Sequence, residues 1–225
     1  TFLKICNCLV KCIYNPVMKI INVKGESMVE IHELKNGIKV IFEAGSHYNS
    51  AAFGVWIKVG SRYESKENNG ISHVIEHMLF KGTKTRTAND ISRETAFLGG
   101  NLNAYTSKED TSFYARTLPE YLNQAIDLIS DMICNSIIDE EELEREKSVI
   151  CEEIDMYKDS PEDYVHECIQ KKVWDNQPLG YYISGKKKTV RGFTREYILE
   201  FIKEHYSGEN MVISVAGKFD KQETL

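Results

Sequence analysis

An α+β fold is predicted by the order in which strand-like and helix-like segments follow one another. Residues 29–59 hold short apolar or alternating segments between turn residues, whereas residues 119–206 mostly show the 3.6-residue period of helices. The full predicted order, β-β-β-α-α-β-β-α-α-α-α-β, favours a mostly antiparallel sheet with helices packed on one side. A length of 225 residues, with 42% hydrophobic and 28% charged residues, suits one globular domain.

The first strands form a predicted hairpin. Val29–Leu34 alternates as a half-buried strand does, Asn36-Gly37 is a strong two-residue turn, and Ile38–Glu43 is the return strand. A longer apolar strand is predicted at Ser50–Val59.

The later elements follow from helical periodicity, capping residues and breaks at glycine or proline. A polar turn precedes most of them, and Lys186–Lys188 is interpreted as a solvated surface run. Helices are predicted to begin at Ile71 and to span residues 87–98, 119–134, 139–158, 161–174 and 194–206, with strands at 101–107, 111–118 and 211–216.

Residues 1–27 differ in composition from the rest of the chain, and we predict that they are an atypical N-terminal extension. They show no clear period, and Lys4, Lys11 and Pro16 interrupt the apolar core that a signal peptide needs. No run in the sequence approaches the length of a transmembrane helix.

The start of the domain is predicted at Met28. The purine-rich codons that can encode Lys24–Glu26 resemble a ribosome-binding site read in frame. Our hypothesis is therefore that residues 1–27 are translated upstream sequence and that the domain comprises residues 28–225.

The motif that carries chemistry lies in Ile71–Thr83, ISHVIEHMLFKGT. On a helix, His73 and His77 are one turn apart and project from the same face, so that both imidazoles can bind one Zn²⁺. Glu76 lies beside that face and could take a proton from a water on the metal. This H-x-x-E-H order is the inverzincin signature, although a solvated helix face would give the same letters.

A zinc ion held by two histidines needs a third protein ligand, and His₂Glu is a catalytic arrangement. The predicted helix at 139–158 is rich in glutamate and supplies the candidates. Its spacing alone does not choose among Glu142, Glu146, Glu152 and Glu153, and an acidic solvated face remains the alternative.

The two stretches ISHVIEHMLFKGT and EREKSVICEEIDMYKD together resemble the M16 family of zinc peptidases, which includes pitrilysin, insulysin and the processing peptidases. The resemblance runs from about Met28 to the end of the chain. It is strongest to the small bacterial branch that is similar to processing peptidases.

The resemblance implies a role for each motif residue. Glu153 lies 76 positions after His77, close to the spacing at which M16 enzymes carry their third ligand. It implies one zinc ion per chain on His73, His77 and Glu153, with Glu76 as the general base and Glu146 supporting the ligands.

The resemblance also implies where a peptide binds. In M16 enzymes the strand that corresponds to Asn101–Thr106 is a sheet edge at the cleft, to which substrate adds as a further strand. Ala104 would leave room for the peptide and Asn103 would hydrogen-bond its backbone. Without the resemblance, an ordinary strand is the preferred interpretation.

A second half is a further implication. M16 chains continue into a second domain of similar fold, and the two halves close like a clamshell over the substrate. This chain ends at Leu225, so we expect the metal-bearing half, without its C-terminal domain, partnered by a second M16-like domain or subunit. The Arg–Tyr pair that the second half supplies in relatives has no counterpart to assign here.

The predicted function is that of a zinc-dependent endopeptidase that hydrolyses unfolded peptides or flexible protein segments. The alternative is a truncated or partner-dependent non-catalytic subunit that binds zinc or peptide without turnover. A net charge of −6 gives no support for nucleic-acid binding, and no membrane partner is predicted. Cys134, Cys151 and Cys168 lack disulfide spacing, which favours a reducing, cytoplasmic location.

Overall fold

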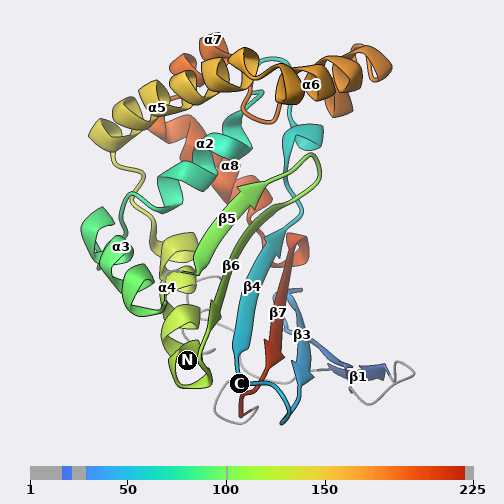
Figure 1. Cartoon of the computed structure of the whole chain (residues 1–225), viewed down its shortest axis with the longest axis vertical. Coiled ribbons are helices and arrows are strands. Elements are labelled where there is room, and N and C mark those ends of the chain that lie inside the picture. Colours follow the sequence, from blue (N-terminus) through green and yellow to red (C-terminus); the bar gives the residue numbers. More distant parts are fainter. Residues whose placement is uncertain (1–16, 22–28, 100, 221–225) are drawn as a thin grey trace.

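The computed structural model describes residues 17–21, 29–99 and 101–220, and its centre is one seven-stranded sheet (Figure 1). The strands are β1 Val17–Ile21, β2 Val29–Glu33, β3 Lys39–Ala44, β4 Ala51–Ile57, β5 Leu102–Thr106, β6 Thr111–Thr117 and β7 Met211–Gly217. They lie in the order β1-β2-β3-β7-β4-β6-β5. All neighbours are antiparallel except β3 and β7, which are parallel. The predicted α+β fold with a mostly antiparallel sheet is therefore confirmed.

Strand β1 lies inside the segment that we predicted as an N-terminal extension. Its 5 residues pair with β2 from Val17–Glu33 to Ile21–Val29. The composition of residues 1–27 did not predict this strand. The remainder of that segment lies outside the described residues, and a start at Met28 stays a prediction.

Apart from α7, the helices agree with the predicted segments to within a few residues. They are α2 Ile71–Leu79, α3 Ala88–Phe97, α4 Leu122–Asn135, α5 Glu140–Asp159, α6 Pro161–Val173, α7 Lys187–Gly192 and α8 Arg195–His205.

Two local differences have simple reasons. Pro119–Tyr121 forms a 3₁₀ turn before α4 rather than the first turn of that helix. Helix α7 begins within the segment Lys186–Lys188, for which only a surface run was predicted. Its one fully buried side chain is Val190. A six-residue helix with a single apolar anchor is too short to show a period in the sequence.

The core lies between one face of the sheet and the helices. Phe42, Phe53 and Phe113 are fully buried on three different strands, and α4 packs on β4 and β6 with Ile126 and Ile129 fully buried. Helix α2 contacts β5, α5 and α8, and in Figure 1 it lies between the sheet and the outer helices α5 and α6. This helix is thus held on several sides.

The starts of several helices carry side-chain caps. Thr87 and Asp90 form a reciprocal capping box at α3, in which each side chain accepts from the other residue's N–H. The Asp139 carboxylate accepts from two N–H groups at the start of α5, and Thr194 caps α8 as its sequence predicted.

Candidate functional site

Helix α2 presents His73, Glu76 and His77 along one side, as the H-x-x-E-H spacing predicts. The two imidazole rings are 4.6 Å apart between centroids. The opposite side of the helix is anchored in the core by fully buried side chains, so its orientation is fixed by packing. These anchors are Ile71, Val74, Ile75, Met78 and Leu79.

A buried carboxylate holds the start of α2. Glu64 is 4% exposed and accepts hydrogen bonds from the backbone N–H groups of Gly70 and Ser72 and from the side-chain amide of Asn69. Burial raises the pKa of the Glu64 carboxyl, and these N–H donors oppose that rise. Gly70 has φ 99°, a left-handed conformation that suits glycine. No motif in the sequence indicated this role.

Glu153 of α5 faces both histidines. Its Oε2 lies 3.7 Å from His73 Nε2 and 3.5 Å from His77 Nε2. One ligand atom from each of the three residues lies within 4.8 Å of the other two. We call His73, His77 and Glu153 the histidine–glutamate cluster.

The other glutamates that the sequence left open face elsewhere. Glu152 is exposed, and Glu142 pairs with Arg145 on the same helix. Glu146 is buried, and its Oε2 lies 3.1 Å from His77 Nδ1. The two glutamates thus lie on different sides of the His77 ring: Glu153 faces Nε2 and Glu146 faces Nδ1.

Lys81 completes the surroundings of Glu146. Its Nζ lies 2.6 Å from Glu146 Oε1, so the two oxygens of that carboxylate meet Lys81 and His77. In neutral His77 with its Nδ1 proton directed to Glu146, the Nε2 lone pair is available on the side of Glu153. The sequence analysis missed Lys81, which lies one turn beyond His77.

The two histidines differ in their affinity for a proton. Burial, together with the charge of His77, lowers the pKa of His73 to about 4. Burial also acts to lower the pKa of His77, but its hydrogen bonds with Glu146 and Glu153 dominate and raise it to about 9. A cation at the cluster would therefore compete with a proton on His77.

The donor set fits zinc. Two imidazole nitrogens and a carboxylate oxygen are zinc donors, and two atoms on a tetrahedral zinc are about 3.3 Å apart. The separations of 3.5 and 3.7 Å are close to that value. Among the described residues, Glu153 forms ion pairs with the two histidines alone. No lysine or arginine of the described residues pairs with Glu153, so a zinc ion would displace the proton of His77.

Glu76 lies between the cluster and the edge of the sheet. Its Oε2 accepts a hydrogen bond of 2.5 Å from the Thr106 hydroxyl of β5. Burial raises the pKa of the Glu76 carboxyl, and this hydrogen bond opposes the rise. The sequence analysis placed Thr106 in the predicted cleft strand but gave its hydroxyl no role.

Strand β5 is the last strand of the sheet on this side, as expected of a strand at a cleft. Asn103 is exposed, and its side-chain oxygen accepts from the N–H of Ala104. Ala104 is half-buried against the core. Within the described residues, neither forms a hydrogen bond or ion pair with the histidine–glutamate cluster, and their roles toward a peptide stay predictions.

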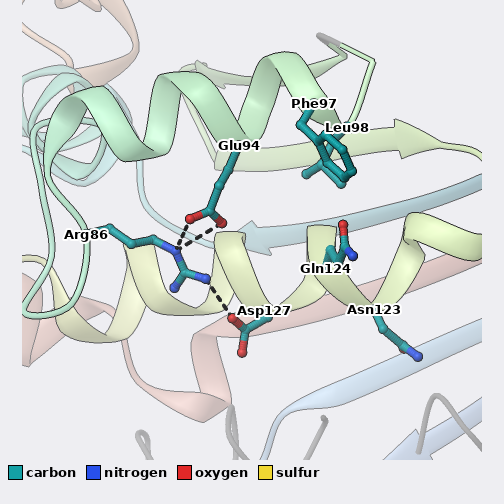
Figure 2. A pocket seen from close by; sticks show the side chains of 7 residues that line it. All are labelled: Arg86, Glu94, Phe97, Leu98, Asn123, Gln124 and Asp127. Carbon is teal, nitrogen blue, oxygen red and sulfur yellow. Dashed lines mark hydrogen bonds and ion pairs between the residues drawn. The ribbon is translucent and has the colours of Figure 1, made fainter.

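A second group of charges lies between α3 and α4, beside a cavity of about 550 Å³ (Figure 2). Arg86 donates from Nε to Glu94 at 3.0 Å, from Nη2 to Asp127 at 2.8 Å and from Nη1 to Asp131 at 2.8 Å. We call these four residues the Arg86 cluster. Its guanidinium nitrogens are all occupied by carboxylates, so this cavity offers no free cation to a ligand.

No helix among the described residues is long and apolar enough to cross a membrane. Cys134, Cys151 and Cys168 form no disulfide in the part of the chain that the structure describes.

Comparison with known proteins places the chain in a family. Residues 39–187 match the model of insulinase, peptidase family M16, and residues 192–225 match that of the peptidase M16 inactive domain. An uncharacterized zinc protease, YmxG, of Bacillus subtilis is 43% identical over 190 residues, which are 84% of this chain and 46% of that protein. A probable mitochondrial-processing peptidase subunit beta of Arabidopsis thaliana is 39% identical over 192 residues, 85% of this chain and 36% of its own length. The chain thus spans less than half the length of either relative.

A solved structure shares the fold. A protease from Helicobacter pylori has a TM-score of 0.81 and 24% identity, over 93% of this chain and 48% of that one. The family models and the identity to zinc proteases, on a fold that brings two histidines and a glutamate together, lead to one conclusion: the chain belongs to peptidase family M16.

Proposed function

We propose that the protein is a zinc-dependent endopeptidase that hydrolyses unfolded peptides or flexible protein segments. The observation that carries the proposal is the histidine–glutamate cluster, in which three zinc donors converge beside a carboxylate that is not one of them. Membership of a family whose relatives are named zinc proteases supports it.

Each residue has a distinct proposed role. His73, His77 and Glu153 would hold one zinc ion, and Glu146 would orient His77 through Nδ1. Zinc bound there would lower the pKa of a water and polarise the scissile carbonyl. Glu76 would take the proton from the attacking water and return it to the leaving amine, as general base and then general acid.

The substrate is proposed to bind along β5. An edge strand has unpaired backbone donors and acceptors, which a peptide can meet in extended form without a required side-chain sequence. Exposed Asn103 and small Ala104 would contact that peptide, and Thr106 at the end of the strand already meets Glu76. A peptide on this edge would therefore run past the proposed base.

A second M16-like domain or subunit is the proposed partner. The chain spans 46% of the Bacillus relative and 36% of the Arabidopsis relative, which is named as a subunit. Enclosure by two halves would restrict substrates to unfolded segments. We also propose a cytoplasmic location, with which three cysteines outside any disulfide, among the described residues, are consistent.

The test combines zinc stoichiometry with cleavage of an unstructured fluorogenic peptide by the 225-residue chain and two variants. We expect one zinc per chain in the wild type and in Glu76→Gln, and none in Glu153→Gln. Hydrolysis by the wild type should fall by roughly 10²–10⁴-fold in Glu76→Gln, the usual contribution of a general base.

Other outcomes have defined meanings. Zinc binding without hydrolysis in the wild type would favour the non-catalytic subunit, or a chain that needs its second half. No zinc at micromolar free metal would overturn the proposal.

A further inference from the structure

We propose that Thr106 is a positioning residue, whose hydroxyl holds the Glu76 carboxylate in the orientation needed for proton transfer. The inference rests on the proposed function of Glu76 as general base and adds a residue to that site. It starts from the 2.5 Å hydrogen bond between Thr106 Oγ1 and Glu76 Oε2, which joins β5 to α2.

The position of Thr106 is fixed by the sheet. It is the last residue of β5 and pairs with Thr111 of β6. Successive side chains of a strand point to opposite faces, so Thr106 shares the face of Ala104 and buried Leu102, whereas Tyr105 is exposed. The hydroxyl therefore comes from the helix-covered face of the strand and not from solvent.

The hydroxyl has a specific partner in Glu76. Among the described residues, Thr106 is the one side chain that donates a hydrogen bond to that carboxylate. The bond occupies Oε2 and leaves Oε1 to accept a proton. A β-branched threonine has a stiff χ1, so it restricts the carboxylate more than a freely rotating donor would.

The Thr106 side chain would thus couple peptide binding on β5 to the position of the general base Glu76. Thr106 belongs to the edge strand on which a peptide is proposed to pair, and its side chain sets the position of the base. A peptide held on β5 would be aligned with the Glu76 carboxylate, and a misplacement near 1 Å costs about 100-fold in rate.

The chain offers a matched control. Thr117 at the far end of β6 is 6% exposed, and its Oγ1 has no hydrogen-bond partner among the described residues. Thr106→Val and Thr117→Val both replace a strand hydroxyl by a methyl group of similar shape. The first variant removes a donor to Glu76, and the second removes none.

The first measurement is the kinetics of hydrolysis of an unstructured peptide by the zinc-loaded chain. We expect kcat of Thr106→Val to fall by about 10–100-fold, because a free carboxylate loses its alignment. KM and bound zinc should stay unchanged, Thr106→Ser should recover most of kcat, and Thr117→Val should match the wild type. An unchanged kcat in Thr106→Val, or a loss that serine does not restore, would overturn the inference.

The second measurement does not depend on turnover. In a chain labelled with ¹³C at glutamate carboxyl carbons, the Glu76 resonance is identified by its absence in Glu76→Gln. We expect Thr106→Val to move that resonance at neutral pH and Thr117→Val to leave it in place. A wild type that binds no zinc and cleaves no peptide contradicts the proposed function, whereas an unmoved Glu76 resonance contradicts the role of Thr106.

Discussion

The histidine–glutamate cluster and the Arg86 cluster both gather charged side chains from separate parts of the chain, yet their hydrogen bonds differ. In the Arg86 cluster the opposite charges are paired with one another. Asp131 accepts hydrogen bonds from Arg86, Thr83 and Thr85 through one carboxylate oxygen and from Asn135 through the other. In the histidine–glutamate cluster, the Glu153 carboxylate faces one nitrogen of each imidazole at 3.5 and 3.7 Å, and its ion pairs among the described residues are with these two histidines alone.

This difference separates structural charges from functional ones. Buried charges that are paired and hydrogen-bonded within the protein stabilise the fold and need nothing more. Imidazole and carboxylate ligand atoms that converge without a lysine or arginine partner are suited to a metal ion. The distribution of hydrogen-bond donors distinguishes the two regions.

The largest difference between the two clusters is expected when a charge is removed from the histidine–glutamate cluster. We expect Glu153→Gln to weaken zinc binding by more than about 100-fold, since loss of an outer partner alone costs about 10–100-fold. The thermal unfolding midpoint of the metal-free protein should stay close to that of the wild type. Calorimetric zinc titration and thermal unfolding measure the two effects, and a large loss of metal-free stability would contradict the assignment.

The reverse experiment is Arg86→Gln, which leaves Asp131 buried with less compensation. We expect the free energy of unfolding to fall by about 2–3 kcal/mol, less than for a fully buried pair because the Arg86 side chain keeps 17% exposure. Zinc affinity should not change. Arg93→Gln is the control, since that arginine is 73% exposed and its loss should hardly alter urea denaturation.

Glu146 shares features with both clusters, so its substitution tests which of the two it resembles. It is buried and has protein partners in His77 and Lys81, yet one of those partners is a proposed zinc ligand. We expect Glu146→Gln to weaken zinc binding by about 10–100-fold without removing it. Zinc affinity equal to that of the wild type would place Glu146 with the structural charges.

Acid should weaken the Arg86 cluster through Asp131. Burial acts to raise the pKa of Asp131, but hydrogen bonds from Thr83, Arg86 and Asn135 outweigh it and lower the pKa below its ordinary value of 3.8. A lowered folded-state pKa means stability that is present above the unfolded value and lost as pH falls through the folded one. Asp131→Asn should therefore be less stable than the wild type near neutrality, and this difference should shrink below pH 3.8 in denaturant titrations.

The smallest expected effect concerns the cap beside the Arg86 cluster. Thr87 begins α3, which carries Glu94, and its hydroxyl accepts from the N–H of Asp90. Thr87→Ala should cost about 1 kcal/mol of stability, as loss of a helix N-cap usually does. Thr87→Ser should restore the unfolding midpoint, and an alanine variant as stable as the wild type would show that the Arg86 cluster holds α3 without its cap.

Local sequence signals predicted most of the fold and the central residues of the site. Helix periodicity identified α2 and α5, and the i, i+4 spacing of His73 and His77 predicted a shared face. The choice of Glu153 over Glu146 came from the resemblance to M16 peptidases, because helical spacing allows both. The structure brings Glu153 to the two histidines, as that resemblance implied.

The features that the sequence did not predict are contacts between distant residues. Thr106 meets Glu76 from 30 positions away, and Asp131 meets Thr83 from 48 positions away. Glu64 lies in a loop whose polar sequence suggests exposure to solvent. Its three hydrogen-bond donors become evident only from the packing of α2 against that loop. No period or motif encodes such pairs, since they depend on how the elements come together.

The place of β7 in the sheet has a consequence for folding. This strand is the last along the chain, yet it lies between β3 and β4 and joins them. Until Met211–Gly217 emerges from the ribosome, β3 and β4 lack their shared neighbour and expose backbone groups that can pair with other chains. The sheet can therefore reach its final form only after nearly all of these residues have been synthesised, and a shortened chain that lacks this strand is open to aggregation.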